Sequence, residues 1–195
     1  MFFFQDLYQV GRQGRYEATP QAVIVGPQTR HSSLCIAGRI DAFAIHFQPT
    51  GFHHLFRVRM KDLADRSLEA RAVLDRSCTR LEEQLADARR FEDRIRIAEQ
   101  FLLKKIPSYP VSDPVAAAVR RITVSRGSSR IDDLVAGSGW TVSQFERKFL
   151  DQIGVAPKLY GRIVRLNQAL GPSWHRQSVL GPKLATSWVT TIRCT

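Results

Sequence analysis

Cysteine is scarce in this chain, with three residues among 195, at Cys35, Cys78 and Cys194. None of them stands in a C-x-x-C pair, which is the spacing that zinc knuckles and thiol redox sites use. Three scattered cysteines also fall short of the paired framework that stabilises small secreted proteins. The pattern argues against both kinds of site, favours a reducing cytoplasm and predicts buried thiols.

Long hydrophobic runs are absent as well. The opening MFFFQDLYQV is apolar only as far as Phe4 and has no basic segment, whereas a signal peptide needs a basic start and a longer apolar stretch. Nowhere does the sequence reach the ~20 apolar residues that a membrane-spanning helix requires. We expect a cytoplasmic protein with no membrane partner.

Acidic residues are outnumbered, because 18 Asp and Glu face 29 Lys and Arg, giving a formal net charge of +11. Such a surplus attracts polyanions, usually nucleic acid or an anionic membrane surface. The hydrophobic fraction of 44% is that of a globular protein with one large domain or two small ones. The charge predicts affinity for a polyanion without identifying it.

Glycine and proline punctuate the first 58 residues, and short runs of β-forming residues lie between them. We expect strands at 22–25, 33–37 and 42–47. In the third run, Phe43, Ile45 and Phe47 alternate with smaller residues, which places three bulky side chains on one face of a sheet. The pattern predicts a partial small β barrel or sandwich.

Helical spacing replaces this pattern from Asp62 to Ile106, where apolar residues such as Leu68 and Leu85 recur every three or four positions among charged ones. This spacing predicts two helices packed as a hairpin. Prolines at 107 and 110 then interrupt it. We therefore expect an N-terminal domain over 1–108, with strands at 1–58 and helices at 62–106.

An all-helical region is expected after this break. Asp113 followed by Pro114 marks a helix start, because a capping side chain precedes a proline at the first helical position. Ser129, with Asp132 three residues later, marks the start of a second, short helix. The glycine-containing turn GSG at 137–139 ends that short helix.

A third helix is predicted over 141–153. Thr141 and Gln144 stand in the T-x-x-Q relation of a capping box, in which side chain and backbone bond reciprocally. An apolar stripe follows at helical spacing, made of Val142, Phe145, Phe149 and Ile153. The stripe should dock on the preceding short helix and leave the polar residues outside.

The polar side of this helix is the candidate site. Two short helices joined by a tight turn, the second carrying Arg and amide side chains, have the arrangement that lets a helix enter the major groove. Arg can bind guanine O6 and N7 together, Gln can pair with adenine, and Lys or Arg can contact phosphates. The candidate DNA-binding residues are Ser143, Gln144, Glu146, Arg147, Lys148, Lys158, Arg162 and Arg165. The alternative interpretation is a solvated helix face with no partner.

These residues also carry a resemblance. The stretches IDDL at 131–134, TVSQFERKF at 141–149 and GVAPKLYGRIVRLNQA at 154–169 resemble the AraC/XylS-type transcription regulators. The resemblance implies an α+β protein that binds promoter DNA, a DNA-binding region over 109–170 and a first helix-turn-helix unit over 129–153. It also implies a recognition helix over 141–153, with Ser143, Glu146 and Arg147 facing the bases.

The N-terminal part resembles a subset of the same family, through VGPQTR at 25–30, Gly38 and AIHFQPTG at 44–51. The resemblance implies a sensor or oligomerisation domain over 1–108, with a small-molecule effector and a homodimer as candidate partners. Compared with the family, the chain begins in the middle of that domain. We therefore expect a regulator that is truncated at both ends.

The resemblance ends at residue 171. The remaining GPSWHRQSVLGPKLATSWVTTIRCT has two Gly-Pro pairs, no acidic residue and no helical stripe, so no second recognition helix can be assigned to 171–195. We hypothesise that a frameshift or truncation produced this tail. Resequencing of the locus tests the hypothesis, which fails if no adjacent frame encodes a second unit.

Other classes of function have less support. No carboxylate completes a metal site around His46, His53 and His54, and Asp65 is interpreted as a charge near a helix start. The sequence has no Ser-His-Asp order, P-loop or G-x-G-x-x-G motif. We expect no enzymatic activity, no metal and no cofactor. The alternatives that remain are a non-DNA interaction or dimerisation protein and a non-functional truncated regulator.

Overall fold

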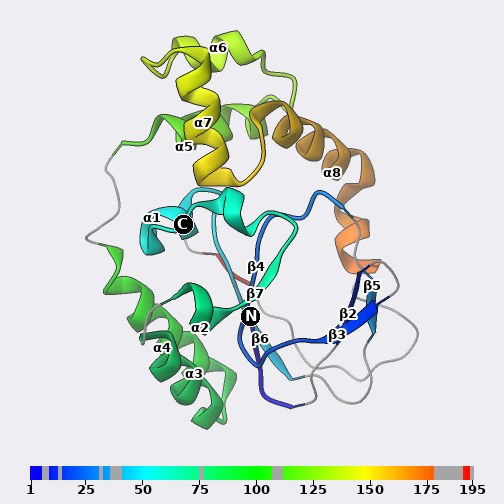
Figure 1. Cartoon of the computed structure of the whole chain (residues 1–195), viewed down its shortest axis with the longest axis vertical. Helices are drawn as coiled ribbons and strands as arrows, with labels where there is room; N and C mark the ends of the chain where they lie inside the picture. Colours follow the sequence, from blue (N-terminus) through cyan, green and yellow to red (C-terminus); the bar gives the residue numbers. More distant parts are fainter. Residues whose placement is uncertain are drawn as a thin grey trace. The chain divides into compact units, whose positions relative to one another are not determined.

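The computed structural model describes residues 1–5, 9–12, 15–30, 33–35, 41–74, 77–106, 112–177 and 191–193. It is a mixed α and β protein (Figure 1). Two compact units are present. The N-terminal unit contains Met1–Val58, Leu63–Tyr109 and Ser187–Thr195, and the C-terminal unit contains Arg59–Asp62 and Pro110–Thr186.

The strands of the N-terminal unit form three small sheets. The first has the order β1 (Phe2–Phe3), β6 (Ala42–His46) and β8 (Thr191–Arg193), and the second β3 (Arg15–Ala18), β2 (Gln9–Arg12) and β5 (Ser33–Cys35). The third pairs β4 (Val23–Val25) with β7 (Ser67–Glu69). The expected partial barrel is wrong for the described strands, because segments of two to five residues pair in separate sheets that do not close.

Strand β7 lies where the sequence predicted a helix. Leu68 pairs with Ile24 in an antiparallel register, so it belongs to a sheet and not to a helical stripe. Asp65, interpreted as a helix-start charge, instead accepts hydrogen bonds from the backbone N–H and the hydroxyl of Thr29, both at 2.6 Å. These bonds hold the pKa of the Asp65 carboxyl below its usual value. A long-range turn contact therefore replaces the predicted local role.

Helices cover a narrower range of the N-terminal unit than expected. Its helices are α1 (Gly51–Phe56), α2 (Ala70–Val73), α3 (Ser77–Asp87) and α4 (Phe91–Leu103). The 3-10 helix η1 (Met60–Leu63) lies mostly in the C-terminal unit. Helices α3 and α4 pack against each other as a hairpin. Their core includes four side chains with 0% exposure, Phe43, Cys78, Leu85 and Ala98. The hairpin is therefore present, but it begins at Ser77 and not near Asp62.

The C-terminal unit is all helical in its described part from residue 112 to residue 177. It contains α5 (Pro114–Val124), α6 (Ile131–Ala136), α7 (Val142–Ile153) and α8 (Pro157–Gln177). Asp113 caps α5 as predicted, because its carboxylate accepts from the N–H of Val115 at 2.9 Å. Helices α6, α7 and α8 enclose a core with parts of α5.

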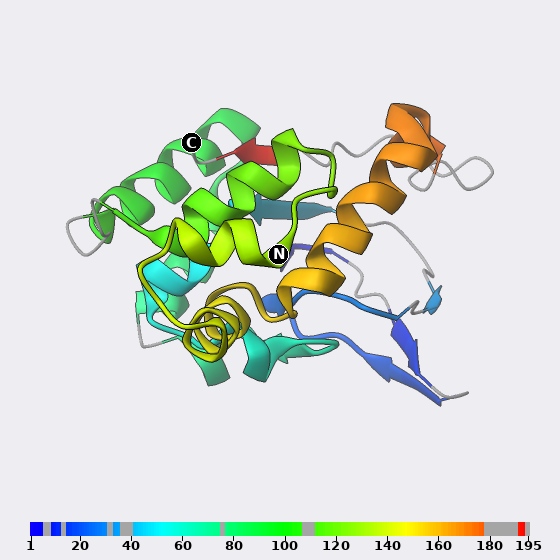
Figure 2. The same ribbon diagram turned by 90° about the horizontal axis from the view of Figure 1, so that it is seen from above.

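Helix α8 runs farther than the sequence predicted. The Gly-Pro pair at 171–172, where the resemblance ends, lies inside this helix, which is the long orange element in Figure 2. A proline removes one helical hydrogen bond and tends to bend a helix without necessarily ending it. The prolines at 107 and 110 and most of the tail, 178–190 and 194–195, lie outside the described residues.

Two further observations concern the described residues alone. None of their helices combines the length and apolar character needed to cross a membrane. No three His, Cys, Asp or Glu side chains among them gather as a metal site requires. His53 and His54 lie in helix α1 and not on a strand, and the Nδ1 atom of His53 lies 2.9 Å from the carbonyl oxygen of Val58.

Candidate nucleic-acid interface

The start of α7 is fixed by a reciprocal pair of hydrogen bonds. The backbone N–H of Gln144 donates to the hydroxyl of Thr141 at 3.3 Å, and the N–H of Thr141 donates to Oε1 of Gln144 at 3.1 Å. Both bonds of the expected capping box are therefore present. The Oε1 atom of Gln144 therefore already accepts a hydrogen bond within the helix start. Bidentate pairing with adenine needs that same atom.

The inner side of α7 is sealed by aromatic packing. Phe145 and Phe149 are 0% exposed, with ring centroids 5.7 Å apart, and Phe149 packs edge-on against Tyr160 of α8 at 5.9 Å. Burial raises the pKa of the Tyr160 hydroxyl, although a hydrogen bond with Thr123 opposes the rise. The predicted stripe is wrong at Val142, which is 47% exposed because it stands at the first position of the helix, beyond the core.

The outer side of α7 has the opposite character. Ser143, Gln144, Glu146, Arg147 and Lys148 are all exposed. Within the described part of the chain, the charged groups of Arg147 and Lys148 have no ion pair, whereas Arg94 forms a two-pronged pair with Asp41 at 3.0 and 3.2 Å. Unpaired cations on a rigid helix are available to an anionic partner.

A short turn joins α6 to α7. Leu134 of α6 is buried against the core that contains Phe145, and the two helices pack together. Gly139 adopts φ +72°, a left-handed conformation that suits glycine, in open space where an added Cβ would meet nothing within 4 Å. The hydroxyl of Ser138 accepts from the N–H of Trp140 at 3.2 Å and donates to the carbonyl of Val135 at 2.7 Å. The turn therefore holds α7 at a defined angle to α6.

Helix α6 starts differently from the prediction. Arg130 occupies the N-cap position and makes no capping bond with its side chain. Ser129, expected to be the cap, instead shares a hydrogen bond with the hydroxyl of Ser125 at 2.7 Å. The Ser129 prediction is wrong because its hydroxyl bonds backward to the end of α5, where the chain turns, and not forward to α6.

The basic residues of α8 fall into two groups. Lys158 and Arg162 are exposed, and neither has an ion pair within the described residues. Arg165 is also exposed, yet its Nη1 atom donates a hydrogen bond to the carbonyl of Gly127. Arg165 therefore joins α8 to the turn after α5, a role that the sequence pattern did not indicate.

Gly127 makes this junction feasible. Its φ is +78°, and a Cβ at this position would lie 2.4 Å from the carbonyl oxygen of Gly161 in α8. Only glycine allows the two backbones to approach so closely. The sequence signal that could have located the junction is a glycine in each of two segments that must pack together.

Comparison with known proteins concerns the N-terminal part alone. Residues 2–69 match the model of a family described as a domain of unknown function (DUF6597). This stretch extends from β1 to β7 and includes none of α6, α7 or α8. No curated protein matches the chain, and no solved structure matches it.

Proposed function

We propose that the chain is a sequence-specific DNA-binding transcription regulator of the AraC type, in which α6, its turn and α7 form a helix-turn-helix unit. The observation that carries the proposal is the two-sided character of α7. Its apolar side is sealed by Phe145 and Phe149, while Arg147 and Lys148 project from a capped helix without an ion pair to any described residue. A helix of this kind is what the major groove accepts.

The residues of the outer surface divide by the contacts that their chemistry allows. Arg147 is suited to guanine, Glu146 can accept from cytosine N4, and Ser143 can donate or accept. Lys148, Lys158 and Arg162 are suited to phosphates, which fix position without reading sequence. Gln144 stabilises the start of α7 and has only its Nε2 group left for DNA.

The expected affinity is modest and depends strongly on salt. About three phosphate contacts predict a slope of roughly −3 for log K against log salt concentration, because each contact contributes about −0.9. We expect this slope for the proposed single unit. The N-terminal unit, including the part that matches the domain of unknown function, is proposed to modulate binding through a small-molecule effector or a homodimer.

The test is fluorescence anisotropy with the full chain, first on a pool of random duplexes and then on sequences enriched from it. Arg147→Ala should lose base preference while keeping most of its non-specific affinity. Arg89→Ala is the matched control, since it removes the same charge from an exposed position of the N-terminal unit. An affinity that does not change with salt, or equal losses in the two variants, contradicts the proposal.

A non-DNA interaction protein is the second candidate. The end of α4 and the residues after it expose two large apolar side chains, Leu103 at 60% and Ile106 at 51%. Apolar groups of this size on a hairpin favour self-association. A dimer in sedimentation velocity, combined with no duplex binding at low salt, would support this function over the first.

A further inference from the structure

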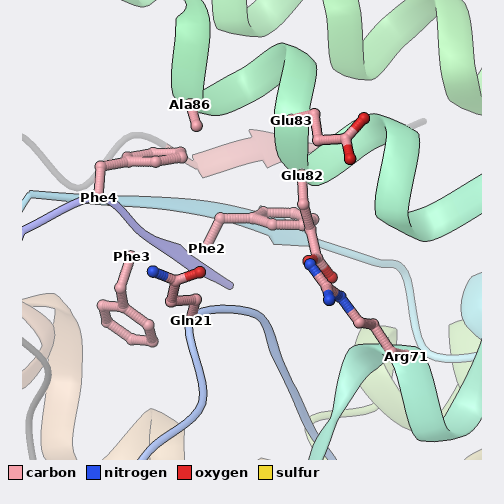
Figure 3. A pocket seen from close by; sticks show the side chains of 8 residues that line it. All are labelled: Phe2, Phe3, Phe4, Gln21, Arg71, Glu82, Glu83 and Ala86. Carbon is pink, nitrogen blue, oxygen red and sulfur yellow. The ribbon is translucent and has the colours of Figure 1, made fainter.

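A groove in the N-terminal unit is lined by the two residues of β1, by residues of α3, and by Phe4, Gln21 and Arg71 (Figure 3). Its volume is about 230 Å³. Pockets that enclose drug-sized ligands measure roughly 300–1,000 Å³. The groove therefore has room for a small fragment and not for a nucleotide or a large cofactor.

The floor of the groove is aromatic. Phe2 and Phe4 pack with the core under α3, whereas Phe3 belongs to a separate cluster because successive side chains of a strand point to opposite faces. Figure 3 shows the rings of Phe2 and Phe4 on one side of the chain and Phe3 turned to the other. The guanidinium of Arg94 covers the Phe4 ring at 3.8 Å from its centroid. One face of the Phe4 ring is therefore already covered, and the apolar floor consists of the rest of Phe4 and the small exposed part of Phe2, which is 8% exposed.

Two of the charged residues at the groove neutralise each other. The Nη2 and Nε atoms of Arg71 lie 2.7 and 2.8 Å from Oε2 of Glu82. The other oxygen of Glu82 accepts a hydrogen bond from the thiol of Cys78 at 3.5 Å. Both carboxylate oxygens of Glu82 are therefore occupied, and the pair adds little net charge to the groove.

Glu83 differs from its neighbour. Its side chain is exposed and has no ion pair or hydrogen bond within the described residues. Ala86, three residues later on the same helix, leaves the rim beside it open. The amide of Gln21 lies elsewhere along the lining, with an oxygen that can accept a hydrogen bond. The net charge of the lining is negative, and Glu83 carries it.

We propose that this groove binds a small organic cation, an ammonium group attached to a flat apolar body. The body lies against Phe2 and Phe4, and the ammonium pairs with Glu83. An organic anion of the same size is disfavoured, because Arg71 is already paired with Glu82. The site goes beyond DNA binding and does not depend on it.

Titration calorimetry of the full chain tests the proposal with 2-phenylethylammonium as the probe and 3-phenylpropionate as its anionic counterpart. We expect saturable binding of the cation with a Kd on the order of 1 mM, and binding of the anion at least about fivefold weaker. Glu83→Gln should weaken cation binding about fivefold, the upper range for a solvent-exposed ion pair. Glu99→Gln, an exposed carboxylate on α4 outside the lining, should leave it unchanged.

A second variant separates shape from charge. Ala86→Leu narrows the open rim without altering any charge, and it should weaken the cation and the anion by the same factor. Circular dichroism confirms that each variant is folded, which is expected because Glu83, Ala86 and Glu99 are all exposed. Three results would each overturn the proposal. They are equal affinity for the two probes, equal effects of Glu83→Gln and Glu99→Gln, and no saturable binding to the folded chain. None of these results bears on DNA binding by the C-terminal unit.

Discussion

The guanidinium of Arg165 donates a hydrogen bond to the carbonyl oxygen of Gly127, and so connects the long helix α8 to the turn that follows α5. The bond crosses 38 residues of sequence. It gives Arg165 a role that differs from that of its neighbour Arg162, although the two are alike in sequence terms. Comparing these two arginines therefore separates stability from DNA contact.

We expect Arg165→Met to destabilise the C-terminal unit by about 1 kcal/mol, since it removes a charged donor from a backbone carbonyl while keeping an apolar stem. Arg162→Met should leave stability unchanged but reduce the salt slope of duplex binding by about 1. Urea denaturation and anisotropy measure the two effects. If Arg165→Met instead reduces the salt slope and Arg162→Met instead lowers stability, Arg165 is the phosphate contact.

Gly127→Ala should destabilise the chain by about 2–4 kcal/mol. The added Cβ meets the Gly161 carbonyl oxygen at 2.4 Å, and φ is +78°, so steric overlap adds to backbone strain. Gly139→Ala is the control, because its φ of +72° imposes similar strain in open space. We expect a loss of about 1 kcal/mol there. Thermal denaturation that finds equal losses would contradict the close contact with α8.

Thr141→Val should cost about 1 kcal/mol, because it deletes the hydroxyl that accepts from the Gln144 amide and keeps the shape of the side chain. Ser143→Ala tests a nearby hydroxyl, which is exposed and makes no capping bond to the described residues. We expect its effect to stay within about 0.5 kcal/mol. If hydrogen exchange at the start of α7 is the same in both variants, the cap does not stabilise the helix.

Cys78 provides a pH-dependent prediction. Burial, followed by the nearby Glu82 carboxylate, raises the pKa of its thiol to about 12 from the ordinary 9.0. In a Cys35→Ser, Cys194→Ser background, the native chain should therefore react with iodoacetamide about 10³ times more slowly at pH 8 than the same chain in urea. Equal rates would show that the thiol is accessible as thiolate.

The same thiol affects stability. Above pH 9 the unfolded chain loses the Cys78 proton while the folded chain keeps it, so the free energy of unfolding falls as pH rises toward 12. Below pH 9 this contribution is fully present. Cys78→Ala should flatten this part of the profile relative to the unsubstituted chain. Unfolding in urea at a series of pH values measures the difference.

The sequence predicted well where local chemistry decides the structure. The capping box at Thr141, the cap at Asp113 and the buried pair Phe145 and Phe149 each depend on neighbours within one or two helical turns. In these segments propensity, capping and periodicity agree. The strand around Phe43 was predicted as well, but its burial does not alternate, since Phe43 and Ala44 are both buried. Phe47, expected on the same face as Phe43, lies beyond the end of the strand at His46.

Some of the failures arise from distant contacts. Leu68 fits a helical stripe, but pairing with Ile24 places it in a strand. Spacing also gave no sign of the bond between Arg165 and the Gly127 carbonyl, 38 residues away. One-dimensional spacing cannot indicate which distant group a side chain will meet.

The double use of Gln144 restricts how this surface can change. Substitutions at Ser143 or Arg147 alter what α7 presents to solvent and leave its first turn intact. A substitution at Gln144 alters the presented surface and loosens the helix start together, since its Oε1 holds the Thr141 amide. Among related chains, substitutions should therefore be more frequent at positions 143 and 147 than at position 144.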